Sequence, residues 1–268
     1  MLSLCATLLL AFSTPAVQAA PAAPPVSGDA GAEVVSAFVF RGIVYEDEGL
    51  LLQPYANLRL QLRDGPTLQN LRLSLGYWAS VNSAQTDASQ MPRALYEIDV
   101  VPALLVDLPA GLSSELRYTA FLSPNGGFDG AHELGLYLRH RAATGPLRWK
   151  TELLVAGPTV TEGARYTYGH LQVRAAHGAW SEGDRYVDLF APVRLGANLR
   201  GEDEVGQVGA QPRYLQLGLG GAYGRDGGSQ GMEAYVQADA IRAADPLVVA
   251  LGQPALQPVF TLGFATWY

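Results

Sequence analysis

Histidine and serine are the first candidates for catalysis in this chain, because an imidazole can activate a hydroxyl nucleophile. The sequence has four histidines, at positions 132, 140, 170 and 177, and none is followed two residues later by serine. A hydrolase that carries both groups on one strand needs this spacing, since alternate residues share a face. Asp129 and His132 can form an acid–base pair, but an acidic loop with one histidine is more often solvated than catalytic. The sequence therefore predicts that the protein is not an enzyme, with a lipid hydrolase as a minor alternative.

Motifs for metals, cofactors and nucleic acids are also missing from the sequence. Cys5 is the one cysteine, and no cysteine and histidine cluster suits a metal. The glycine-rich run from Gly218 to Gly224 lacks the following helix that a phosphate-binding loop needs, so it is interpreted as relief of crowding inside a barrel. The 18 Lys and Arg residues are outnumbered by 25 Asp and Glu and form no basic patch. We expect no cofactor, no metal and no nucleic-acid partner.

The dominant pattern is alternation of apolar and polar residues, which places one kind on each face of a β-strand. Segments of about ten residues in this pattern are typical of membrane strands, because one face meets lipid and the other meets the lumen. We predict an all-β fold, an antiparallel up-and-down transmembrane β-barrel of about twelve strands. The predicted strands are residues 33–45, 51–63, 68–81, 94–107, 111–122, 131–142, 147–156, 165–176, 186–200, 212–225, 231–243 and 257–268.

A soluble antiparallel sandwich or a lipocalin-like barrel alternates equally well, with its apolar face turned inward. Aromatic residues at the predicted strand ends, such as Trp149 and Trp267, resemble the girdles at membrane interfaces and favour the membrane barrel. The last strand runs to the final residue, with Phe260, Leu262, Phe264 and Tyr268 on one face. Such an ending is typical of outer-membrane barrels. It predicts the lipid bilayer as one partner and the barrel-assembly machinery, through this strand, as another.

The N-terminal part of the chain predicts export. Leu2 to Phe12 form an apolar run of about 11 residues, which is shorter than the roughly 20 that span a bilayer and has the length of a secretory h-region. We therefore expect a signal peptide at residues 1–19, a flexible periplasmic leader at 20–32 and an outer-membrane barrel at 33–268.

The connections between predicted strands alternate in length, which indicates an orientation. The connections after even-numbered strands are mostly tight, while those near 82–93, 123–130, 201–211 and 244–256 are long. Short periplasmic turns and long outer loops are the usual arrangement, so both termini are expected in the periplasm. Two connections disagree, because 46–49 is short for an outer loop and 177–184 is long for a turn. The strand number is accordingly 10 to 14.

Charged residues on the face opposite the leucines are expected to line the lumen, and their two signs nearly balance. The candidates are Arg41, Arg59, Arg72, Glu97, Asp99, Glu115, Arg117, Arg139 and Arg194. They are consistent with a solute filter and equally with a salt-bridged interior that only braces the barrel. Glu202, Asp203 and Glu204 are expected at an acidic outer rim that attracts cations or contacts lipopolysaccharide through divalent ions, unless they are ordinary solvated loop residues.

The first half of the chain also resembles the TorF-type porin family. The resemblance lies in Ala37 to Pro54 (AFVFRGIVYEDEGLLLQP), Gly76 to Ser83 (GYWASVNS) and Tyr96 to Val100 (YEIDV), within residues 37–130, and is weaker after Gly130. It implies a small outer-membrane barrel with channel activity. We therefore expect a porin-like passive channel for small solutes or ions, with a non-conducting structural or adhesive barrel as the alternative.

Overall fold

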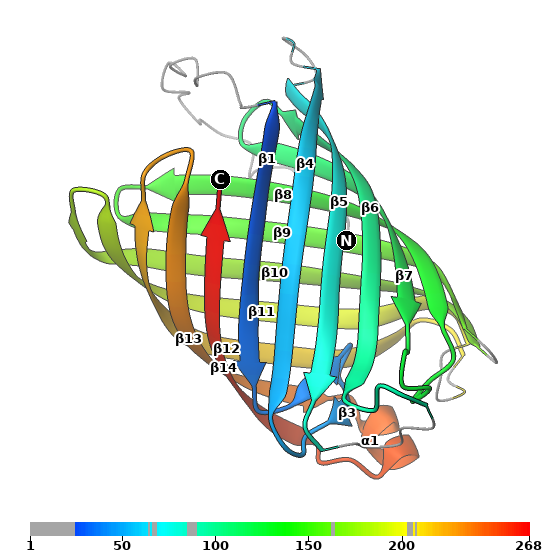
Figure 1. Cartoon of the computed structure of the whole chain (residues 1–268). Helices are drawn as coiled ribbons and strands as arrows, with labels where there is room; N and C mark the ends of the chain where they lie inside the picture. The colour runs from blue at the N-terminus through cyan, green and yellow to red at the C-terminus, as the bar shows by residue number, and fades with distance from the viewer. Residues whose placement is uncertain are drawn as a thin grey trace, which may run out of the picture.

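Twelve antiparallel strands form a closed barrel in the computed structural model, which describes residues 25–63, 65, 69–84, 90–161, 164–202, 206 and 208–268 (Figure 1). The barrel strands are β1 (Val26–Val35), β4 (Leu51–Arg63), β5 (Gln69–Asn82), β6 (Leu95–Leu108), β7 (Leu112–Leu122), β8 (Ala131–Thr144), β9 (Leu147–Thr161), β10 (Ala164–Glu182), β11 (Arg185–Glu202), β12 (Gln211–Asp226), β13 (Gly231–Ala243) and β14 (Leu256–Trp267). Each pairs with its neighbours in sequence, and β1 closes the barrel between β14 and β4. The predicted fold class is confirmed.

Two further strands, β2 (Phe38–Phe40) and β3 (Ile43–Glu46), form a small hairpin that is not part of the barrel wall. A single short helix, α1 (Asp245–Leu251), lies between β13 and β14 among the described residues. Within the same residues, no helix is long and apolar enough to cross a membrane.

The prediction was wrong for the first strand. Residues 26–32, predicted as part of a flexible leader, belong to β1, and the expected strand at 33–45 does not form. β1 is built mainly from small residues, because its neighbours carry aromatic rings. A Cβ added to Gly31 would lie 2.7 Å from both Cζ and the hydroxyl oxygen of Tyr55. Alanine and glycine give little alternation in hydropathy, so the sequence pattern misses this strand. The predicted signal peptide and residues 20–24 lie outside the described residues.

The two connections of unexpected length also have structural reasons. Because β1 ends at Val35, the connection to β4 spans residues 36–50 and contains the β2–β3 hairpin, so it is long. β10 continues to Glu182 and β11 begins at Arg185, which leaves a tight turn at Gly183 and Asp184. Gly183 has a φ of 60°, a left-handed conformation that glycine adopts without strain.

The barrel has two dissimilar ends. We call "loop end" the one that carries the connections at 36–50, 83–94, 123–130, 203–210 and 244–255, and "turn end" the one that carries the tight turns, the start of β1 and Tyr268. In Figure 1, α1 and β3 lie at the loop end, and the C-terminus lies at the opposite end.

The barrel is apolar outside and polar inside. Leu58, Leu75 and Leu136 are between 45% and 57% exposed, whereas the side chains of Arg41, Glu115 and other charged residues are buried in the interior. A soluble barrel would place its apolar face inward, because burial of apolar surface drives its folding. The observed polarity excludes the soluble sandwich or lipocalin-like alternative and matches strands whose outer face meets lipid.

The terminal strand closes the barrel, so we predict that its outer face and last residue are needed for assembly. Phe260, Leu262 and Phe264 are 61%, 58% and 47% exposed, and Tyr268 exchanges backbone hydrogen bonds of 2.9 and 3.0 Å with Gly28. Deleting Tyr268, or changing Phe260 and Phe264 to serine, should lower the assembled fraction by more than half, measured as the heat-modifiable band in outer-membrane fractions. Phe264→Leu keeps an apolar outer face and should assemble normally. Equal assembly of all variants would contradict this role.

Candidate functional site

The β2–β3 hairpin lies inside the barrel at the loop end (Figure 1). Its strands pair through Val39 with Val44 and Phe40 with Ile43, and its turn is Arg41–Gly42. Gly42 has a φ of 85°, and a Cβ there would lie 2.8 Å from the Cβ of Tyr214 on β12. The arginine–glycine pair therefore lets the tip of the hairpin turn tightly and contact the barrel wall.

Arg41 attaches the hairpin tip to strands of the wall. Its Nη2 donates to Glu133 Oε2 on β8 at 2.6 Å, and its Nη1 donates to the hydroxyl of Tyr166 on β10 at 3.1 Å. Arg213 Nε, on β12, donates to the carbonyl oxygen of Arg41 at 3.2 Å. Arg41 is 6% exposed and its guanidinium lies 4.1 Å from the ring centre of Tyr168. A charge-assisted, stacked contact of this kind fixes the tip strongly in a buried environment.

The aromatic residues of the hairpin pack against the wall formed by β5, β6 and β7. The ring centres of Phe38 and Trp78 are 5.5 Å apart, and Phe38 also contacts Tyr96 at 6.1 Å. Phe40 contacts Phe121 edge-on at 5.8 Å. With aromatic contacts to β5–β7 and polar contacts to β8, β10 and β12, the hairpin extends across the lumen.

The loop that contains α1 supports the hairpin from the loop end. The side-chain amide of Gln253 donates to the carbonyl of Val44 at 2.8 Å and accepts from the Val44 amide at 3.1 Å. The hairpin is therefore held by contacts at its tip, its aromatic face and its base.

Five of the other eight predicted lumen charges form ion pairs along the wall. These pairs are Arg59–Asp29, Arg72–Asp107 at 2.8 Å, and Arg117–Glu115, Arg139–Glu115 and Arg139–Glu152, each at 2.5 Å. Each joins residues of one strand or of hydrogen-bonded neighbouring strands. Among the described residues, the pairs of this ladder follow the wall, whereas Arg41 joins the hairpin to it.

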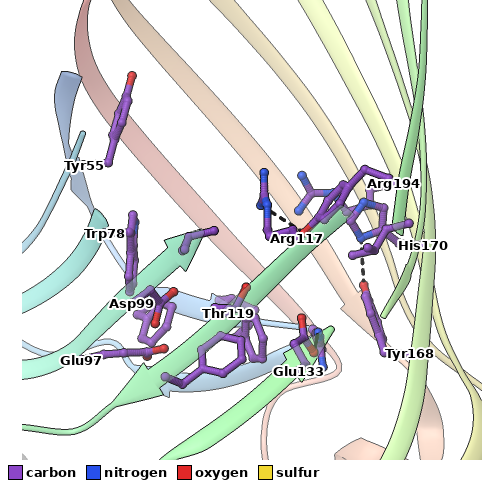
Figure 2. A pocket seen from close by; sticks show the side chains of 18 of the residues that line it. Tyr55, Trp78, Glu97, Asp99, Arg117, Thr119, Glu133, Tyr168, His170 and Arg194 are labelled. Carbon is purple, nitrogen blue, oxygen red and sulfur yellow. Dashed lines mark hydrogen bonds and ion pairs between the residues drawn. The ribbon is translucent and has the colours of Figure 1, made fainter. Parts of the chain in front are cut away.

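Two cavities lie in the lumen beside the hairpin, and Phe38 and Val39 line both. The first cavity has a volume of about 520 Å³, and Figure 2 shows its lining. Charged residues on its lining are Arg41, Glu97, Asp99, Glu115, Arg117, Glu133 and Arg194. The second cavity, of about 470 Å³, is lined mainly by β1 and β10–β14 and includes Glu33, Arg174, Glu233 and Asp239.

The predicted site residues thus fall into three groups. Glu97, Asp99, Glu115, Arg117 and Arg194 line the first cavity together with Arg41, which the structure moves from a barrel strand to the hairpin. Arg59, Arg72 and Arg139 belong to the wall ladder. Glu202 ends β11 at the loop end, while Asp203 and Glu204 lie outside the described residues.

Sequence reasoning missed Arg213, which is 1% exposed, and the ring of Tyr168 beside Arg41. Alternation places both residues inward, but it gives no sign that they meet the hairpin.

The histidines make other contacts than the acid–base pair considered from the sequence. His132 stacks on Tyr118 at 6.4 Å, is exposed, and forms no described contact with Asp129. His170 bonds instead to Glu152 at 3.1 Å. Across the described part of the chain, no three His, Cys, Asp or Glu side chains are grouped to hold a metal ion.

Comparison with known proteins finds structural similarity only. No protein-family model matches the sequence, and no curated protein matches it. The COG4313 outer membrane channel from Pseudomonas putida F1 superposes with a TM-score of 0.50 at 11% identity, over 95% of this chain and 99% of that one. The fold is that of an outer-membrane β-barrel. The beta domain of the Bordetella autotransporter BrkA (TM-score 0.47, 12% identity, 90% and 97% covered) and LpxR from Salmonella typhimurium (0.44, 9%, 88% and 99%) are more distant.

We predict that the buried anchor of the hairpin matters more for stability than a wall ion pair. Arg41→Ala takes a guanidinium away from the buried carboxylate of Glu133 and should lower the free energy of unfolding by about 3 kcal/mol. Arg59→Ala is the matched control, because the side chains of Arg59 and Asp29 are 26% and 24% exposed and the change should cost less than about 1 kcal/mol. Urea unfolding in detergent micelles measures both. Equal losses would contradict the assigned role of Arg41.

Proposed function

We propose that the protein is a passive channel for small solutes in the outer membrane, with the β2–β3 hairpin as its constriction. The observation that carries this proposal is that the charges in the lumen fall into two groups, one paired along the wall and one that attaches the hairpin. The ladder pairs follow the wall, and the hairpin is the element that extends across the lumen. A barrel whose lumen is closed by its own charges would instead pair them from one wall to the other.

The lumen provides the polar surroundings that a hydrated solute needs. Both cavities carry charges of both signs, and the second adds the amides of Gln53, Gln172 and Gln237. Balanced charge favours small polar or weakly charged solutes over selection of one ionic sign. The resemblance of residues 37–130 to the TorF-type porins supports the same function.

For orientation, we propose that the turn end faces the periplasm and the loop end faces outward. Short periplasmic turns and long outer loops are usual in these barrels, and the export signal predicted at residues 1–19 fits this placement. The hairpin then lies at the outer mouth, where Glu202 at the end of β11 can contact cations or lipopolysaccharide.

The orientation is tested by single cysteines in a mature chain that otherwise has none once residues 1–19 are removed. Val208→Cys lies on a loop at the loop end, where Val208 is 67% exposed, and Gly227→Cys lies in the turn between β12 and β13. An impermeant maleimide should label intact cells carrying the first variant, and cells carrying the second only after the outer membrane is opened. Reversed labelling would overturn the orientation.

The constriction is tested by replacing the hairpin. Val35 and Leu51 are register partners in the β1–β4 ladder, so a four-residue turn can replace residues 37–48 without breaking the barrel wall. In planar bilayers, the wild type should conduct weakly and the replaced protein several times better, because the lumen loses the element that extends across it. The same linker in the loop between β11 and β12 should change conductance little.

The alternative is a non-conducting structural or adhesive barrel, and the firm attachment of Arg41 is the observation that favours it. If the hairpin variant folds but conducts no better than the wild type, the channel proposal fails and this alternative is preferred.

A further inference from the structure

The charges that line the first cavity are not all neutralised by one another. Arg41 pairs with Glu133, Arg117 pairs with Glu115, and the imidazole of His170 meets Glu152. The remaining charged groups on the lining are Glu97, Asp99 and Arg194. Figure 2 shows Glu97 and Asp99 on one side of the cavity and Arg194 on the other.

Glu97 and Asp99 form a carboxyl pair without a cationic partner. They are alternate residues of β6, so both point inward, and both line the first cavity side by side. Glu97 is only 7% exposed, and Oδ1 of Asp99 is buried without a hydrogen-bond donor. Within the described part of the chain, no Lys or Arg forms an ion pair with either residue. Two carboxyl groups placed together in a buried position are costly to ionise unless a cation joins them.

Aromatic rings surround this carboxyl pair. Trp78 on β5 and Phe121 on β7 are the register partners of Asp99 on either side, and both line the cavity. Phe38 of the hairpin lies 5.5 Å from Trp78 and adds a third ring. Aromatic faces attract cations, and together with a buried carboxylate they form the chemical surroundings that recognise an organic ammonium group.

Arg194 on β11 supplies the opposite charge. Its guanidinium hydrogen-bonds to the neutral side chain of Gln172, through Nε at 2.7 Å and through Nη2. No carboxylate among the described residues forms an ion pair with it. The planar donors of a guanidinium match the geometry of a carboxylate, so Arg194 is suited to bind one from a ligand.

We propose that the first cavity binds a small zwitterion, with its ammonium group at Glu97 and Asp99 and its carboxylate at Arg194. Such a ligand neutralises both ends of the cavity, whereas a simple amine or acid leaves one end unpaired. A cavity of about 520 Å³ has the size of a small-molecule site. The zwitterion is then a solute of the proposed channel, so its physiological role rests on the proposed function, although binding itself requires no conduction.

Equilibrium dialysis of the full barrel in detergent micelles tests the site, with radiolabelled γ-aminobutyrate as the probe and butylamine and butyrate as competitors. We expect saturable binding of the zwitterion, about tenfold or more tighter than that of either competitor, because each competitor keeps one of the two charge contacts. Glu97→Gln and Asp99→Asn should each weaken probe binding about tenfold, and Arg194→Gln should do the same while leaving competition by butylamine unchanged.

Glu233→Gln is the matched control, because this carboxylate also faces the lumen but lines the second cavity. It should bind the probe like the wild type, and heat-modifiable migration should verify that every variant is folded. Absence of saturable binding, or binding that is insensitive to both Glu97→Gln and Arg194→Gln in folded protein, would overturn the site. Butylamine that binds as tightly as the zwitterion would overturn the part assigned to Arg194. Binding without solute entry into liposomes would leave the site standing and refute the channel.

Discussion

The hydrogen-bond ladder between β1 and β14 is the constraint on which the rest of the structure depends. Backbone groups in a bilayer cannot bond to water, so strands can cross only if they form a closed ring. Here closure needs the small-residue strand β1, which pairs with both β14 and β4. Once β1 ends at Val35 beside Leu51, residues 36–50 must begin and end at nearly one point, and part of this segment folds into the lumen as the β2–β3 hairpin.

Closure also decides where charge can be placed. The outer face is left to leucine, valine and aromatic residues, so arginines and carboxylates on the strands point inward. Neighbouring strands bring most of these charged side chains close enough to form ion pairs along the wall, as Arg139 does with Glu115 and Glu152. Four of the predicted lumen charges do not follow this pattern of pairing along the wall. Arg41 joins the hairpin to the wall, and Glu97, Asp99 and Arg194 remain available to a ligand on opposite sides of one cavity.

Much of the fold could be predicted from the sequence, and the parts that could not have physical reasons. Strands 51–63 and 231–243 have the predicted bounds because their alternation is strong and their ends are marked by turn residues. The pattern misses β1 because alanine and glycine give no clear alternation, and it predicts one wall strand at 33–45 because a hairpin alternates like a barrel strand. Inward parity identified Glu97, Asp99 and Arg194, but only the register of neighbouring strands shows which charges find partners. The contact of Arg41 with Glu133 joins positions 92 residues apart, and no local pattern encodes it.

The central claim is that the hairpin, and not the barrel wall, limits passage through the lumen. The most direct measurement is the size limit for uncharged sugars, determined by swelling of liposomes that contain either the wild type or the protein with residues 37–48 replaced by a short turn. If the hairpin limits passage, the replaced protein admits larger sugars than the wild type, while the rates for the smallest sugars rise less. An identical size limit for two folded barrels would contradict it.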